Sequence, residues 1–95
     1  MKIYIAGRIT GDPDYYEKFR EAQVELEAQG HIVLNPAELP QGMHGEEYMR
    51  ICFAMIDCAD VVGMLSDWHE SAGARLEHSY CNYIGKNTFL IEEGL

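Results

Sequence analysis

The sequence predicts an α/β fold in which a four-stranded parallel sheet is covered by helices on both faces. Short runs of β-forming apolar residues alternate along the chain with longer segments of helical periodicity. Strands that alternate with helices are joined by right-handed crossovers, which makes the sheet parallel. The chain then predicts the strand order 2-1-3-4, with a topological switch point between strands 1 and 3.

Each element has its own local signal. Strands are predicted at residues 2–6, 31–34, 60–65 and 88–91, and helices at residues 13–30, 46–59 and 71–85. In the first helix, Asp12 is the expected cap and Pro13 the first helical residue. The apolar residues of that helix recur at helical spacing and form one face, at Tyr15, Phe19, Ala22 and Leu26.

Length and cysteine content point to one small domain in a reducing compartment. The 95 residues form a single domain, 1–95, near the lower limit for an independent core, so we expect a homo-oligomer. The three cysteines form no CxxC pair and lie in apolar stretches, as buried free thiols do. An odd number of cysteines without disulfide spacing predicts a cytoplasmic protein. The apolar run before Gly7 is too short for a signal sequence or a membrane span, so no membrane association is expected.

Charge and motif content exclude several functions. Lys and Arg total 7 against 16 Asp and Glu, for a net charge of -9, so polymeric nucleic acid is not an expected partner. The negative net charge does not exclude a small anionic ligand, because a helix N-terminus can bind an anion locally. The four histidines show no metal-ligand spacing, and the chain has neither GxGxxG nor a Walker lysine. We therefore expect no metal and no cofactor.

The start of the third helix is the best candidate for a site. Ser71 is a good N-cap, and Gly73 and Ala74 leave the first turn almost bare, so its free amides can hold an anion. Helical side chains lean toward the N-terminus, which directs the Glu77 carboxylate back over Gly73 and Ala74. The alternative interpretation of Glu77 is an exposed helix glutamate.

Loop 7–13 follows the first strand and is expected to face this helix start across the switch point. Gly7 and Gly11 let the backbone approach a ligand, Thr10 offers a hydroxyl, and Arg8 offers a guanidinium that can clamp a phosphate. Arg8 could equally pair with one of the many acids on the surface.

Two aromatic residues are ambiguous by sequence. Tyr4 either directs its hydroxyl into the site or packs in the core. Trp68 either stacks on a base or closes the edge of the core.

Three segments resemble a known family. They are IYIAGRITG at residues 3–11, GHIVLNPAELP at 30–40 and CADVVGMLSDWHESAGARLE at 58–77. They resemble the nucleoside 2-deoxyribosyltransferase-like superfamily, and in particular its small branch of uncharacterised, DUF4406-like domains. The resemblance covers most of the chain, and the S-x-G-A-x-x-E pattern with its upstream Asp and Trp is its most specific part.

The resemblance implies a flavodoxin-like, Rossmann-like three-layer sandwich. It also implies an enzyme, a hydrolase or deoxyribosyltransferase, that cleaves the N-glycosidic bond of a deoxynucleoside or its 5′-monophosphate. In active relatives the glutamate matched by Glu77 is the nucleophile of a retaining double displacement, and the tyrosine matched by Tyr4 orients that carboxylate.

The chain departs from the family pattern at three positions. Ser71 stands where transferases carry an aspartate that binds sugar hydroxyls, and nucleotide hydrolases have serine there to hold a phosphate. Arg8 replaces a proline or serine at a phosphate-facing point, which also suits an anion. Cys52 replaces an aspartate that contacts the base and assists proton transfer, and a thiol is a poor acid near neutral pH. Asp57 lies on a different side of the same helix and does not substitute for it.

Three functions are consistent with these residues. The first is the N-glycosidic-bond enzyme acting through Glu77. The second is a non-catalytic nucleotide-binding module with the same pocket, which the Cys52 substitution favours. The third is a structural or protein-interaction role, in which Ser71, Gly73 and Arg8 would tolerate substitution.

Overall fold

The computed structural model describes residues 1–94 and has the predicted α/β topology, β1-α1-β2-α2-β3-α3-β4. The strands are β1 (Lys2–Ala6), β2 (Ile32–Leu34), β3 (Val61–Met64) and β4 (Thr88–Leu90). The helices are α1 (Tyr15–Ala28), α2 (Gly45–Cys58) and α3 (Ala72–Ile84). All strand pairs are parallel and the order is β2-β1-β3-β4, as predicted.

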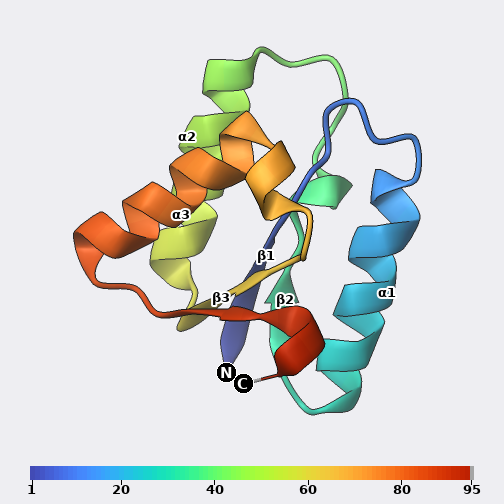
Figure 1. Cartoon of the computed structure of the whole chain (residues 1–95), viewed down its shortest axis with the longest axis vertical. Coiled ribbons are helices and arrows are strands. Elements are labelled where there is room, and N and C mark those ends of the chain that lie inside the picture. The colour runs from blue at the N-terminus through green and yellow to red at the C-terminus, as the bar shows by residue number, and fades with distance from the viewer. Residues whose placement is uncertain (95) are drawn as a thin grey trace.

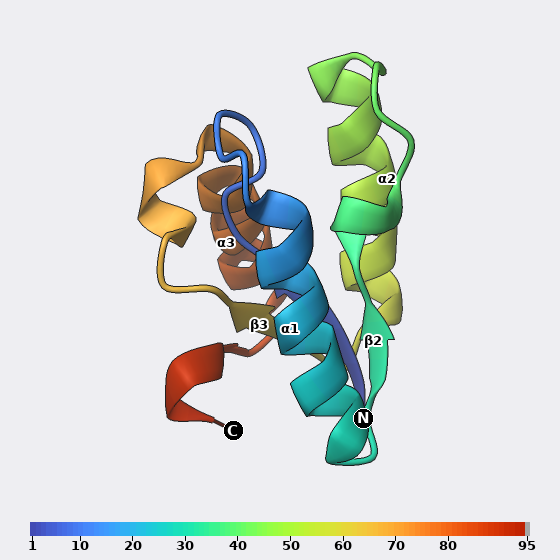
Figure 2. The ribbon, with the colours of Figure 1, turned by 90° about the vertical axis from the view of Figure 1, so that its right-hand side faces the viewer.

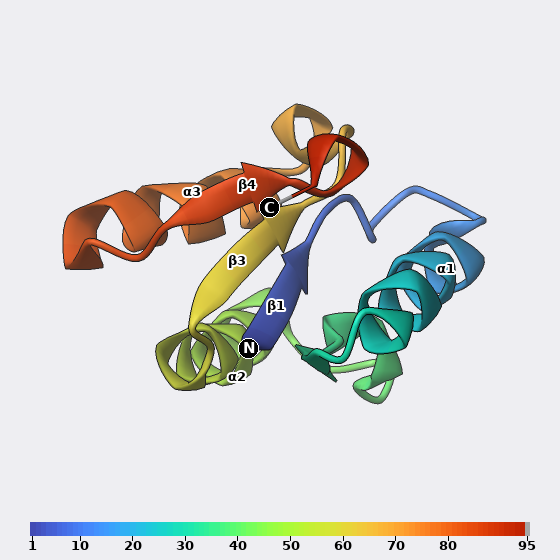
Figure 3. The same ribbon diagram turned by 90° about the horizontal axis from the view of Figure 1, so that it is seen from below.

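The sheet lies between two helical layers. Helix α1 covers one face, and α2 and α3 cover the other (Figure 1). Seen from below, β1, β3 and β4 run side by side between these layers (Figure 3). The predicted three-layer sandwich is therefore confirmed.

Alternation of side chains along β1 divides the core in two. Ile3 and Ile5 face α1 and pack with Phe19 and Leu26. Tyr4 and Ala6 face the other layer, where α2 and α3 contribute further buried apolar side chains, among them Cys52, Ile56 and Cys81. Because successive strand residues point to opposite faces, the same strand that anchors α1 also delivers Tyr4 to the α2–α3 side.

Local details differ from prediction. Helix α1 begins at Tyr15, not at Pro13, and Asp12 does not cap it. Instead, Asp12 Oδ1 accepts a hydrogen bond of 2.8 Å from the Asp14 amide in the turn before the helix. An aspartate that bonds the amide two residues on forms a local turn, which here competes with the first helical turn. The loops after β2 and β3 also contain short 3₁₀ helices, Pro36–Glu38 and Trp68–Glu70.

The helix starts and loops that could form a site lie at one end of the molecule. The first turns of α1, α2 and α3 all lie at the end where β1 terminates (Figure 2). The loops after β1 and β3 meet there, since the Arg8 amide donates to Asp67 Oδ1 at 3.1 Å. Within residues 1–94, no helix is long and apolar enough to cross a membrane.

Candidate active site

A cavity of about 930 Å³ opens at this end of the sheet. Its walls come from β1 and its loop, from the first turns of α1, α2 and α3, and from the loop between β2 and α2. The predicted site residues that line it are Tyr4, Gly7, Thr10, Ser71, Gly73, Ala74 and Glu77. The structure thus brings together predicted residues from two distant segments of the chain, residues 4–10 and 71–77.

Glu77 lies on the wall of this cavity and is only 6% exposed. Its Oε2 atom accepts a hydrogen bond of 2.8 Å from the Tyr4 hydroxyl, across 73 positions of sequence. The interpretation of Glu77 as an exposed helix glutamate is therefore wrong. Tyr4 is fully buried with its hydroxyl at the site, so it both packs in the core and contacts the carboxylate.

The surroundings of Glu77 alter its acidity. Burial raises the pKa of the carboxyl to about 7, while the Tyr4 hydroxyl and the Cys52 thiol beside it lower the pKa in part. Burial also raises the pKa of Cys52 to about 11, so the thiol stays protonated near neutral pH. A carboxyl with a pKa near 7 is a nucleophile or base when ionised and a hydrogen-bond donor when protonated.

The first turn of α3 forms the neighbouring wall. Ser71 caps the helix as predicted, its Oγ accepting a hydrogen bond of 3.1 Å from the Ala74 amide. The Ser71 hydroxyl hydrogen remains available to donate. The amides of Ala72 and Gly73 have no hydrogen-bond partner among the described residues. They belong to the N-terminus of α3, which lines the cavity and is the positive end of the helix dipole. This turn can therefore hold an anionic or strongly polar group.

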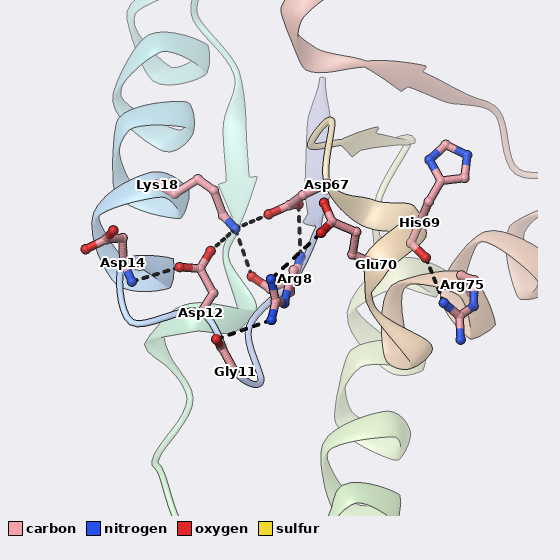
Figure 4. A network of polar contacts seen from close by, with 9 residues as sticks. All are labelled: Arg8, Gly11, Asp12, Asp14, Lys18, Asp67, His69, Glu70 and Arg75. Atoms are coloured by element: carbon pink, nitrogen blue, oxygen red, sulfur yellow. Dashed lines mark hydrogen bonds and ion pairs between the residues drawn. The ribbon is translucent and has the colours of Figure 1, made fainter.

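The loop after β1 is fixed by a polar network (Figure 4). Lys18 of α1 donates to the Arg8 carbonyl at 3.0 Å and forms ion pairs with Asp12 and Asp67. Asp67 also accepts the Arg8 amide. Asp67 thus ties the loop after β3 to the loop after β1 and to α1 at once.

Gly7 and Gly11 are needed in this loop for different reasons. A Cβ at Gly7 would lie 2.7 Å from Leu65 Cδ1 and 3.2 Å from Asp67 Oδ1, so a side chain there would require Leu65 to move. Gly11 has a φ of +82°, a conformation that favours glycine.

Three predicted site residues do not line the cavity. Arg8 donates to the Gly11 carbonyl at 3.3 Å, and its guanidinium lies 3.9 Å from Glu70, which does line it. Gly11 shapes that turn from outside the wall. Trp68 stacks on His78 and packs against the core cluster of α2 and α3, as in the core-edge alternative.

Other wall residues were not predicted from the sequence. The loop before α2 contributes Leu39 and Gln41, α2 contributes Glu46, Tyr48 and Met49, and the first loop and helix contribute Ile9 and Tyr15. Lys18 carried no motif, and Asp67, the upstream aspartate of the family-like pattern, had been given no role in the site.

Two further observations limit the chemistry. No group of three or more His, Cys, Asp or Glu side chains in the described part of the chain is placed to hold a metal ion. Asp57 accepts a hydrogen bond of 2.6 Å from Tyr80 on the exposed surface and is not in the cavity wall. Asp57 therefore does not replace Cys52 in the wall, and the acidic residue that α2 does contribute there is Glu46.

Comparison with known proteins gives relatives of two kinds. Residues 1–89 match the family described as Domain of unknown function (DUF4406), and no curated protein matches the sequence significantly. The 2-deoxyribosyltransferase of the psychrotolerant bacterium Bacillus psychrosaccharolyticus is 22% identical with a TM-score of 0.69, over 95% of this chain and 71% of that one. The 2-deoxyribosyltransferase of Leishmania mexicana is 18% identical with a TM-score of 0.74, over 94% of this chain and 62% of that one.

The family match runs from the first residue of the chain into β4. The structural matches extend over the same elements, and at such low identity they establish the fold alone. The chain therefore belongs to the DUF4406 family, an uncharacterised branch of domains with the 2-deoxyribosyltransferase fold.

Proposed function

We propose that this protein is an N-glycosidic-bond enzyme, a hydrolase or deoxyribosyltransferase, that acts on a deoxynucleoside or its 5′-monophosphate. The observation that carries the proposal is the Glu77 carboxylate, buried on the wall of an open cavity and hydrogen-bonded to Tyr4 at 2.8 Å. The 2-deoxyribosyltransferases that share the fold support it.

In the proposed mechanism, Glu77 is the nucleophile of a retaining double displacement. Its ionised carboxylate attacks the anomeric carbon and forms a glycosyl ester as the base leaves. Water or a second base then attacks the same carbon and releases Glu77. Tyr4 is a positioning residue, because its hydroxyl fixes one carboxylate oxygen and leaves the other for attack.

The first turn of α3 is the proposed subsite for the 5′ end of the substrate. The amides of Ala72 and Gly73 and the Ser71 hydroxyl are donors that suit a phosphate or a sugar hydroxyl. Arg8 is not in the wall, so the donors of this turn do not share the ligand with its guanidinium.

The second candidate function is a non-catalytic nucleotide-binding module with the same cavity. Cys52 favours it, because burial raises the pKa of its thiol to about 11, which makes it a poor acid for protonating a leaving base near neutral pH. Such a module would bind its ligand without turnover.

Base release distinguishes the two. Purified protein is incubated with a panel of 2′-deoxynucleosides and their 5′-monophosphates, and free base is measured by chromatography. The enzyme proposal expects release from at least one substrate and a loss on the order of 10³-fold in Glu77→Ala. Glu21→Ala, on the exposed surface of α1, is the matched control. No release from any substrate, or undiminished release by Glu77→Ala, contradicts the proposal.

Ser71→Asp tests the 5′ subsite. Aspartate caps helices as well as serine does, so the fold should be preserved. Its negative charge should abolish stabilisation by a 5′-monophosphate and leave the response to the nucleoside, as read by thermal shift. Equal loss with both ligands would argue against a phosphate at this turn.

A further inference from the structure

The charge of the cavity wall is one-sided. Three glutamates, Glu46, Glu70 and Glu77, line it, and none of the described lining residues is Lys, Arg or His. Arg8 approaches Glu70 at 3.9 Å between exposed side chains, and such pairs are weak. Apart from the free amides at the start of α3, the wall therefore presents negative charge to whatever occupies the cavity.

The cysteine and two of the tyrosines in the wall are poorly placed to protonate a leaving base. The Cys52 thiol holds its proton too tightly for this purpose. The Tyr4 hydroxyl is already donated to Glu77, and the Tyr48 hydroxyl is donated to the Pro40 carbonyl. A neutral base departs as an anion unless it is protonated, whereas a cationic base departs as a neutral molecule and needs no proton from these groups.

Aromatic and thioether groups also line the cavity. Tyr15, Tyr48 and Met49 are half-buried there. Gln41 donates to the Tyr15 hydroxyl at 2.8 Å, which links the loop before α2 to α1. Flat, polarisable groups of this kind attract a flat cation by cation–π contact.

We infer that the preferred substrates of this site are N-glycosides of a cationic heteroaromatic base, such as a pyridinium or an N-alkylated purinium. The inference rests on the proposed function and specifies its leaving group. Glu46 and Glu70 attract the cationic ring to the cavity, and the aromatic wall holds its face.

With a cationic base, cleavage of the carbon–nitrogen bond needs no general acid. A Glu77 oxygen forms a bond to the anomeric carbon as the carbon–nitrogen bond breaks. The electron pair of that bond passes to the ring nitrogen, which loses its positive charge, and the base leaves as a neutral molecule. Water then attacks the anomeric carbon, the ester electron pair returns to Glu77, and the water proton is released to solvent.

The first experiment measures binding with the nucleophile removed. Glu77→Gln keeps the shape of the side chain and prevents turnover. Its ligands are the nicotinamide 2′-deoxyriboside cation and the neutral 1,4-dihydro form, which differ mainly in ring charge. We expect the cation to bind roughly tenfold tighter in calorimetry at low salt, with the preference reduced by added salt. Equal or weaker binding of the cation overturns the inference.

The second experiment locates the preference. Adding Glu46→Gln and Glu70→Gln to Glu77→Gln should remove most of the preference without changing the affinity for the neutral form. Glu21→Gln is the control, because it makes the same type of charge change outside the cavity. A preference lost equally in the control reflects the net charge of -9 and overturns the assignment to the wall.

Turnover by the wild type separates this inference from the proposed function. Base release from the cation with a larger rate enhancement over the uncatalysed reaction than from neutral deoxynucleosides supports both. A larger enhancement with neutral deoxynucleosides overturns the inference and leaves the proposed function intact. Release from neither overturns both, even where the cation binds.

Discussion

Glu77 is held where a carboxylate is costly to ionise. The side chain is buried, and desolvation favours its neutral form, which raises its pKa to about 7. One hydroxyl donor, Tyr4, works in the opposite direction. Glu77 is consequently present in both protonated and ionised forms near neutral pH. Its effect on the stability of the fold and its reactivity as a nucleophile should therefore both depend on pH.

Glu77→Gln should therefore stabilise the fold, and more so at higher pH. Between pH 4.5 and about 7 the folded protein holds a proton on Glu77 that the unfolded chain has released, so rising pH lowers the free energy of unfolding. The loss is complete above about pH 7 and amounts to about 3 kcal/mol. Urea unfolding of both proteins at pH 5 and pH 8 measures it. If the difference in the free energy of unfolding between Glu77→Gln and the wild type does not grow with pH, Glu77 is not a buried carboxylate that ionises in this range.

Tyr4→Phe should shift the titration of Glu77 to higher pH. Removing the hydroxyl takes away the hydrogen bond that stabilises the ionised carboxylate, and it costs about 1–3 kcal/mol of stability by leaving a buried oxygen unpaired. Carbon-13 NMR of the Glu77 carboxyl measures the titration midpoint directly. Base release at pH 7 should decrease, because a higher midpoint leaves less of the carboxyl ionised. The control is Tyr80→Phe, which removes a hydroxyl that donates to Asp57 on the surface. An unchanged midpoint in Tyr4→Phe would deny Tyr4 its positioning role.

At the scale of elements, the site depends on how two loops are fixed at the carboxyl edge of the sheet. The parallel register places Tyr4 of β1 opposite Val62 of β3, so the loops that follow these strands emerge side by side. Asp67 then joins them through the Arg8 amide and Lys18. This connection sets the loop after β1 against the capped start of α3 and gives the cavity a defined wall.

Asp67→Ala should loosen the loop after β1 without unfolding the sheet. Hydrogen exchange of the Arg8 amide should become about tenfold faster or more, because its acceptor is lost. Asp67→Asn keeps an acceptor oxygen and should leave that amide nearly as protected, although its ion pair with Lys18 is gone. The Ala74 amide, which bonds Ser71, serves as the internal reference. Slow exchange of the Arg8 amide in Asp67→Ala would mean that other contacts fix the loop.

At the scale of the molecule, the chain is a small sandwich with short edge strands. Strands β2 and β4 form the two edges, with three residues each. Large apolar side chains remain exposed on several elements, including Ile32 on β2 and Tyr83 on α3, which is 90% exposed. A domain of this size has limited core, and burial of such side chains against another copy would add to its stability.

We therefore predict that the protein is a homo-oligomer in solution. Light scattering coupled to size exclusion should give a mass of two or more chains, and the unfolding midpoint should rise with protein concentration. The effect should persist at moderate salt, because apolar burial does not depend on charge screening. A single-chain mass at micromolar concentration contradicts the prediction.

Local patterns account for most of the fold. Strand runs, helical periodicity and right-handed crossovers were enough for the element order and the sheet order, because these depend on residues close in sequence and on backbone chirality. The Ser71 cap followed from the same local rules. The start of α1 did not, because Asp12 bonds the Asp14 amide and delays the helix to Tyr15.

The sequence by itself determined that a capped, uncrowded helix start would lie at the switch point with Glu77 one turn further along. Only the tertiary structure decided that Glu77 is buried, that Tyr4 is its partner, and that Arg8 stays outside the wall. These outcomes depend on contacts between residues far apart in the chain, such as Tyr4 with Glu77 and Asp67 with Lys18. Packing across the sheet fixes such contacts, and no periodicity or local spacing encodes them.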